Sequence, residues 1–124
     1  LVEEAKKHIK TIKANEVKSL VDKEQCTLID LRDIREIWKE GTFKDALHIP
    51  RGMLEFWLDP SSKYYKKNKF DNNKKMVLFC ALGFRSALAN KTLKDMGYQN
   101  VVDAEGGFEN LKKTGLKIVF KEKK

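Results

Sequence analysis

Short apolar runs alternate along the chain with stretches in which apolar residues recur every three or four positions. Runs of four or five apolar or β-branched residues are typical of buried strands, whereas the longer spacing is typical of amphipathic helices. The pattern predicts strands over 27–31, 46–49, 76–79 and 101–103, and a weak edge strand over 116–120. It predicts helices over 2–10, 34–39, 52–58, 86–96 and 108–113, a further helix capped by Asn15, and a polar loop over 61–75.

Strands that alternate with helices indicate an α/β fold with a mostly parallel sheet. In such sheets, binding sites form beyond the carboxyl ends of the strands. Asp30, His48, Cys80 and Asp103 each stand at or near the end of a predicted strand. We therefore expect these four residues to meet at one edge of the sheet, in a single domain that spans residues 1–124.

Cys80 carries the strongest chemical signal in the chain. It follows the apolar run 77–79 and precedes, by a short loop, a helix-forming stretch that is expected to begin at Ser86. Backbone N–H groups converge at a helix start, and the helix dipole favours negative charge there. A cysteine in that position is expected to be a thiolate more often than a free cysteine is, and the thiolate is the nucleophile. The sequence therefore predicts Cys80 as a catalytic nucleophile.

Composition limits the classes of partner. The chain has 124 residues, 41% of them hydrophobic, and no apolar run approaches the ~20 residues that span a bilayer. The net charge is +8, but the basic residues comprise 22 lysines and four arginines that are spread among acidic residues. Nucleic-acid binders favour arginine and cluster their charge. We therefore expect no nucleic-acid partner, no membrane partner and a cytoplasmic location. Because the chain starts at Leu1 rather than Met, removal of an N-terminal targeting segment is left as an alternative.

The densest group of lysines has two interpretations. It is either a solvated loop or a positive rim that attracts an anionic substrate or an acidic partner. The group comprises Lys63, Lys66, Lys67, Lys69, Lys74 and Lys75.

The second cysteine, Cys26, is predicted to lie far from Cys80. Cys26 opens its strand and Cys80 follows the end of another; at ~3.3 Å per residue, the start and end of such a strand are roughly 13 Å apart. A disulfide needs Cα atoms within about 7 Å. We interpret Cys26 as a small buried hydrophobic residue rather than a resolving thiol. The two histidines, His8 and His48, lack metal-ligand spacing, so we expect no metal and no cofactor, with His48 as a structural, hydrogen-bonded residue.

An ordered set of motifs resembles one known family. The set comprises Asp30-x-Arg32, Gly41, Ala46-x-His48-Ile49-Pro50-x-Gly52, Cys80-x4-Arg85-Ser86, Gly97-Tyr98-x-Asn100-Val101 and Gly106-Gly107-Phe108. In order and spacing it resembles the single-domain rhodaneses, which are sulfurtransferases, over about residues 12–115. The resemblance implies a three-layer fold with a central, mostly parallel sheet of about five strands and helices on both faces.

The resemblance also implies roles for particular residues. Cys80 would take a sulfane sulfur from a donor such as thiosulfate and hand it, as a persulfide, to cyanide or to a thiol such as thioredoxin or a glutathione-like acceptor. Asp30 and Arg32 would form a supporting pair at the end of their strand. The substrate-binding loop would comprise Ala81, Leu82, Gly83, Phe84, Arg85 and Ser86, with Ala81, Leu82 and Phe84 as an apolar lip.

Arg85 has two compatible interpretations. It helps to form the loop, and it pairs with a carboxylate such as Asp30 or Glu36. Glu55 and Trp57 either edge the site or, as we favour, serve packing. The sequence departs from the family at Gly41-Thr42-Phe43, at Lys44-Asp45-Ala46 and after the double glycine, where the usual tryptophan is absent.

Two other functions remain alternatives. A phosphatase or arsenate reductase of the same fold has one more residue between its cysteine and arginine, which makes a wider loop for a tetrahedral anion. A non-catalytic module of the family would bind a protein partner, and such modules commonly lack the cysteine that this chain retains. We favour the thiosulfate sulfurtransferase.

Overall fold

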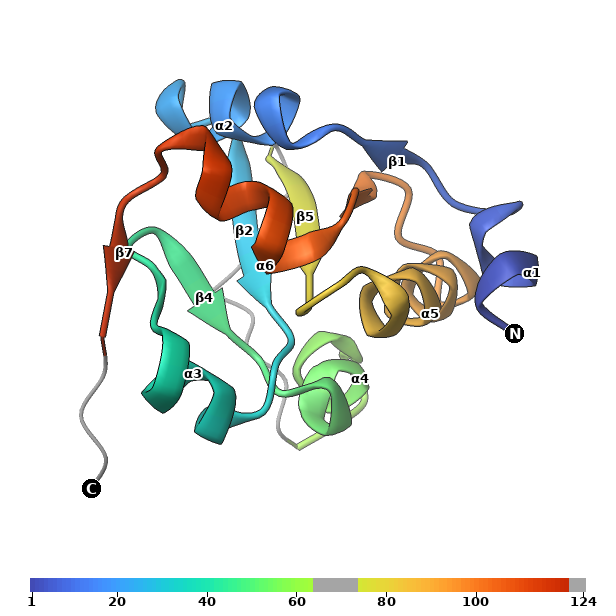
Figure 1. Cartoon of the computed structure of the whole chain (residues 1–124). Helices are drawn as coiled ribbons and strands as arrows, with labels where there is room; N and C mark the ends of the chain where they lie inside the picture. Colours follow the sequence, from blue (N-terminus) through green and yellow to red (C-terminus); the bar gives the residue numbers. More distant parts are fainter. Residues whose placement is uncertain (64–73, 121–124) are drawn as a thin grey trace.

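Five parallel strands form the central sheet, in the order β1-β6-β5-β2-β4 (Figure 1). The computed structural model describes residues 1–63 and 74–120. Every neighbouring pair in the sheet is parallel. The α/β fold with a parallel sheet of about five strands is therefore confirmed. The strands are β1 (Thr11–Ile12), β2 (Cys26–Asp30), β4 (Ala46–His48), β5 (Lys75–Phe79) and β6 (Val101–Ala104).

Helices cover both faces of the sheet, as the three-layer prediction requires. Successive strand residues point to opposite faces, so Leu28 and Val77 join one core cluster and Ile29 and Leu78 the other. The first cluster packs against α2 (Ala14–Asp22) and α6 (Gly107–Leu111), and the second against α4 (Leu54–Leu58) and α5 (Phe84–Asp95). Two layers of buried side chains thus hold the strands in register.

The remaining elements surround this sandwich. Helix α1 (Val2–Lys6) packs on α5, and α3 (Ile34–Glu40) follows β2. Two short 3-10 helices, η1 (Arg51–Met53) and η3 (Lys112–Thr114), extend α4 and α6. The expected edge strand over 116–120 is only β7 (Ile118–Val119), and it pairs antiparallel with an unexpected strand, β3 (Thr42–Phe43), in a separate two-stranded sheet.

Several predicted helix boundaries are wrong. The helix expected over 2–10 ends at Lys6, since the chain must extend to reach β1. Asn15 lies inside α2, because Lys13 has the extended backbone of the cap position. The helix expected from Ser86 begins at Phe84, after Gly83 in a left-handed conformation (φ +103°). Residues 64–73, with three of the six lysines of the dense group, lie outside the described part of the chain.

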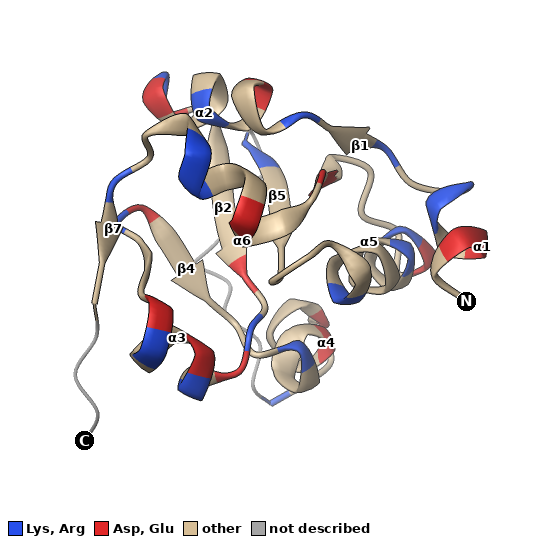
Figure 2. Ribbon diagram, in the orientation of Figure 1, with Lys and Arg blue, Asp and Glu red and all other residues tan. Residues whose placement is uncertain are grey.

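Charge is mixed over the surface. Basic and acidic residues alternate along α2 and α3, without segregation of one sign on either helix (Figure 2). Among residues 1–63 and 74–120, no helix has the length and apolar content needed to cross a membrane.

Candidate active site

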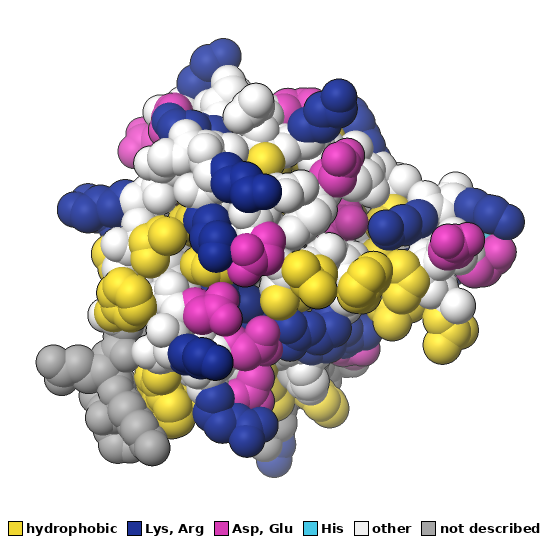
Figure 3. Space-filling view, in the orientation of Figure 1, with side chains coloured by type: hydrophobic (Ala, Val, Ile, Leu, Met, Phe, Trp, Pro, Cys, Tyr) yellow, Lys and Arg dark blue, Asp and Glu magenta, His cyan; other side chains and the backbone are white. Residues whose placement is uncertain are grey.

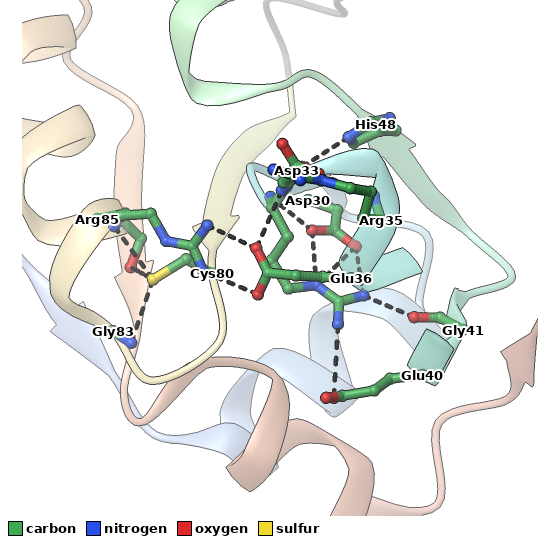
Figure 4. Close-up of polar contacts among 12 residues, drawn as sticks. Asp30, Asp33, Arg35, Glu36, Glu40, Gly41, His48, Cys80, Gly83 and Arg85 are labelled. Carbon is green, nitrogen blue, oxygen red and sulfur yellow. Dashed lines mark hydrogen bonds and ion pairs between the residues drawn. The ribbon is translucent and has the colours of Figure 1, made fainter. Parts of the chain in front are cut away.

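The ends of the central strands bring the predicted residues to one edge of the sheet. Asp30 is in register with His48 on β4 and with Phe79 on β5, and Asp103 is in register with Leu78. Cys80 is the residue immediately after β5. The expectation that these four residues converge is therefore met. Cys80 and Asp103 are joined through Ser86, and Asp30 and His48 through Arg32. Figure 4 shows Cys80, Asp30 and His48 together with the Arg85–Glu36 ion pair.

The Cys80 thiol is buried in a small cradle of polar groups, with 1% of the residue exposed. The backbone N–H groups of Gly83 and Ser86 point at Sγ, at 3.2 and 3.4 Å. The thiol itself donates to the Ser86 hydroxyl at 3.7 Å. Converging N–H groups at a helix start stabilise an anion without a full charge. The cradle therefore suits a sulfur atom that becomes negatively charged.

Two glycine positions allow the chain to form this cradle. Gly83 closes the loop with a positive φ, where a side chain would be strained. Gly107 packs so tightly that a Cβ atom there would lie 2.3 Å from the carbonyl oxygen of Cys80. That same oxygen accepts the N–H of Phe108 at 2.7 Å. The Gly106-Gly107 motif thus supports the Cys80 loop from the start of α6. The sequence shows this motif but does not predict its contact with Cys80.

Arg85 lies in the first turn of α5 rather than in the loop proper. Its guanidinium donates to both carboxylate oxygens of Glu36 on α3, at 2.7 and 3.0 Å (Figure 4). Of the two partners proposed for Arg85, Glu36 is therefore correct and Asp30 is wrong. The bidentate hydrogen bonds from Arg85 lower the pKa of the Glu36 carboxyl. The pKa of Arg85 is raised, mainly by its hydrogen bonds to Glu36 and to a lesser degree by Cys80.

Asp30 and Arg32 form a buried ion pair beside the cradle, with neither residue exposed. The Arg32 Nη2 atom donates to Oδ2 at 2.8 Å and Nε donates to Oδ1 at 3.0 Å. Thr42 donates its hydroxyl to the same carboxylate at 2.6 Å, and Arg32 also donates to the Gly41 carbonyl. The pair therefore ties the end of β2 to β3, and the described contacts do not join it to Cys80.

Most other candidate residues have structural roles. His48 places Nε2 2.7 Å from the Arg32 carbonyl oxygen. Glu55 pairs with Arg51 at 2.7 Å, and Trp57 packs against the core cluster of α4 and α5. In the two described stretches, no group of three or more His, Cys, Asp or Glu residues could hold a metal ion.

Cys26 differs from its prediction in one respect. It lies at the opposite edge of the sheet from Cys80, in register with Lys75 at the start of β5, and both cysteines are free. However, Cys26 is only partly buried, because it lines a cavity of about 590 Å³ beneath α2. Burial nevertheless raises the pKa of its thiol to about 11.

Two exposed apolar residues lie on the loop beside the cradle. Leu82 and Phe84 are each 56% exposed, on either side of Gly83. Figure 3 shows apolar side chains beside charged ones in the region of the start of α5. Arg85 and Glu36, which are partly exposed, add a neutral ion pair. The entrance therefore combines apolar surface with little net charge.

Comparison with known proteins agrees with this geometry. A Rhodopseudomonas palustris protein of unknown function, named as a possible tyrosine phosphatase, is 39% identical and covers 95% of this chain and 90% of its own, with a TM-score of 0.87. The polysulfide-sulfur transferase homodimer of Wolinella succinogenes is 31% identical over 98% of this chain and 85% of its own, with a TM-score of 0.74.

A curated relative is a longer enzyme. The tRNA uridine(34) hydroxylase of Erwinia tasmaniensis is 30% identical over 116 residues. The match covers 90% of this chain and 32% of the relative, so the chain spans about a third of that protein's length. Residues 13–114 match the rhodanese-like domain, and the chain belongs to the rhodanese-like domain family.

Proposed function

We propose that the protein is a sulfurtransferase that carries sulfur as a persulfide on Cys80. The Cys80 thiolate attacks the terminal sulfur of a donor such as thiosulfate, so that a new S–S bond forms at Sγ. The S–S bond of the donor breaks, and sulfite leaves with the electron pair. Cyanide or a thiolate then attacks the terminal sulfur, and the Cys80 thiolate is regenerated.

The observation that carries the proposal is the set of donors around Sγ. Two backbone N–H groups converge on the sulfur from Gly83 and Ser86. A persulfide anion needs donors rather than acceptors, and preorganised N–H groups provide them in a site shielded from water. The likeness to the Wolinella succinogenes polysulfide-sulfur transferase also supports the proposal. A small-molecule donor, a thiol acceptor and a cytoplasmic location belong to the same proposal.

Intact-protein mass spectrometry tests the proposal directly. After incubation with thiosulfate, we expect a gain of one sulfur atom, which cyanide removes as thiocyanate. The Cys80→Ser variant should show neither the gain nor thiocyanate formation. Cys26→Ser is the matched control, because its thiol lies at the opposite edge of the sheet, and it should load as the wild type does. A wild-type protein that gains no sulfur from thiosulfate or polysulfide would favour a non-catalytic binding module.

A phosphatase is the second candidate, favoured by the name of the Rhodopseudomonas palustris protein. Against it, four residues rather than five separate Cys80 from Arg85, and Arg85 is engaged by Glu36. A phosphate group would have to displace Glu36 to reach the guanidinium. Hydrolysis of an aryl phosphate without any sulfur loading would support the phosphatase and exclude our proposal.

The curated relative raises a further question about tRNA. Because the chain is similar to one third of an enzyme named for tRNA, its lysines are a reasonable surface to test for binding. We expect no specific complex with bulk tRNA at physiological salt in a gel-shift assay. A complex that survives there would favour a function that involves tRNA.

A further inference from the structure

Asp103 is a buried carboxyl group that the proposed sulfur transfer does not use. It lies on β6, is 1% exposed, and accepts the Ser86 hydroxyl at 2.5 Å. The Ser86 oxygen is in turn 3.7 Å from Sγ of Cys80, and the whole Ser86 residue is buried. A thiol, a hydroxyl and a carboxyl thus form a continuous buried row from the reactive sulfur to β6.

The protons in this row obey a simple constraint. An ionised Asp103 can only accept, so the single Ser86 proton points toward it, and the Ser86 oxygen can only accept from the Cys80 thiol. A protonated Asp103 donates to Ser86, which frees the Ser86 proton to point toward sulfur. The ionised carboxyl is therefore matched to the Cys80 thiol, and the protonated carboxyl is matched to a thiolate or persulfide anion.

The surroundings allow Asp103 to change its charge near neutral pH. Burial raises the pKa of its carboxyl to about 6, although the hydrogen bond from Ser86 on α5 and the charge of Lys6 on α1 lower it. The strand β1 presents the uncharged Thr11 in register. Arg85, at the start of α5, is engaged by Glu36. No described ion pair fixes Asp103 in its charged form.

We propose that Asp103 is a positioning residue that receives the Cys80 proton through the Ser86 hydroxyl when the thiol becomes a nucleophile. The thiol proton moves to the Ser86 oxygen while the Ser86 proton moves to an oxygen of Asp103, so the row keeps its net charge. Sγ then forms its bond to the donor sulfur. The loaded persulfide anion accepts the Ser86 hydroxyl, and Asp103 holds the proton until the sulfur departs. The loading step in this scheme rests on the proposed function, but the proton movement does not.

Alkylation of Cys80 by iodoacetamide, followed between pH 5 and 10 by mass spectrometry of the peptide that contains Cys80, tests this proposal. In the wild type, the rate should rise in two steps. The lower step, near pH 6, marks removal of the first proton from the coupled pair, and the upper step marks removal of the second. Asp103→Asn, which cannot accept a proton, should lose the lower step and keep one. Ser86→Ala removes the connecting hydroxyl and should also lose the lower step.

The matched control is Asp95→Asn. Asp95 is exposed, lies on α5 as Ser86 does, and pairs with Lys91. The Asp95→Asn variant should keep both steps. A single step in the wild type, or a lower step that persists in a folded Asp103→Asn or Ser86→Ala variant, would overturn the proposal. Thiosulfate loading is measured on the same samples, so the two ideas can fail separately. Two steps without sulfur loading would reject the proposed function alone, and sulfur loading with one step would reject the role of Asp103 alone.

Discussion

Removal of Arg32 should destabilise the fold strongly. Asp30 and Arg32 are both fully buried, so the Arg32→Met variant leaves a carboxylate without its cation in the protein interior. Arg32 gives that carboxylate side-chain hydrogen bonds from Nε and Nη2, and its guanidinium lies 4.0 Å from the centre of the Phe108 ring. The hydrogen bonds from the Arg32 backbone N–H and from Thr42 remain after the substitution.

The size of the effect follows from these contacts. Hydrogen bonds to charged groups contribute about 1.5–3 kcal/mol each, and breaking a buried ion pair costs about 3–5 kcal/mol. Because the remaining two donors keep part of the Asp30 hydrogen bonding, we expect Arg32→Met to lower the free energy of unfolding by about 3–4 kcal/mol. The double variant Asp30→Asn/Arg32→Met has no buried charge and should recover about 1–2 kcal/mol of that loss.

Urea denaturation at pH 7.5, followed by tryptophan fluorescence, measures these differences. Arg35→Met is the matched control, because Arg35 pairs with Asp33 at the surface and its side chain is 82% exposed. It should unfold at the same urea concentration as the wild type. The reasoning is refuted if Arg32→Met is as stable as this control, or if the double variant is no more stable than Arg32→Met alone.

Three further predictions concern the site and the second thiol. Gly107→Ala should reduce sulfur loading by about tenfold or more, because the new Cβ displaces the loop; Gly52→Ala, with nothing within 4 Å of its Cβ, should load normally. Glu36→Gln should raise kcat/KM for thiosulfate several-fold at low salt, since Arg85 regains an uncompensated charge; an unchanged or lower value would contradict this. In the Cys80→Ser variant, iodoacetamide alkylation of Cys26 should increase up to about pH 11, and a plateau below pH 9 would disprove the effect of burial.

The strands and the meeting of their ends were predictable because they depend on local patterns. A run such as 76–79 is apolar enough to be buried on both faces, and parallel strands bring their carboxyl ends to one edge. The strand β3 has no comparable signal, and the weak alternation over 116–120 that predicted β7 does not indicate its partner, because the two strands pair across 75 residues of chain or more. Their pairing is a property of the packed molecule, so no local pattern could reveal it.

The start of α5 shows how a sound local rule fails. A helix-forming stretch begins at Ser86, which made it the expected first residue. Serine is also a residue that commonly caps helices. In the structure, the Ser86 N–H points to the sulfur of Cys80 and its hydroxyl is donated to Asp103, so neither group caps a helix end. Gly83 takes the cap position instead. The N–H and hydroxyl groups of Ser86 thus bind residues of the site instead of capping the helix, and the sequence alone does not distinguish these two roles of a serine.

The choice of Glu36 as the partner of Arg85 follows from what surrounds Asp30. Asp30 accepts hydrogen bonds from Arg32 and Thr42, in a site with no exposed surface, and has no need of a second cation. Glu36 is partly exposed on the first turn of α3, where it completes a capping box with Asp33, and both of its carboxylate oxygens also accept hydrogen bonds from Arg85. The partner of Arg85 therefore depends on which carboxylate already has its hydrogen bonds from other residues. Those hydrogen bonds form only in the folded protein, so the sequence does not show them.

Asp30 and Asp103 show how one sheet edge supports two kinds of buried carboxylate. Asp30 accepts hydrogen bonds from a guanidinium, a backbone N–H and a hydroxyl. Asp103 accepts one short hydrogen bond from Ser86, and burial raises the pKa of its carboxyl. The first group is therefore part of the packing that ties β2 to β3, whereas the second is a carboxyl that burial makes easier to protonate. Among the described contacts, Ser86 connects Asp103, and not Asp30, to Cys80. In the proposed proton transfer, the proton that leaves Cys80 therefore has a buried acceptor two hydrogen bonds away.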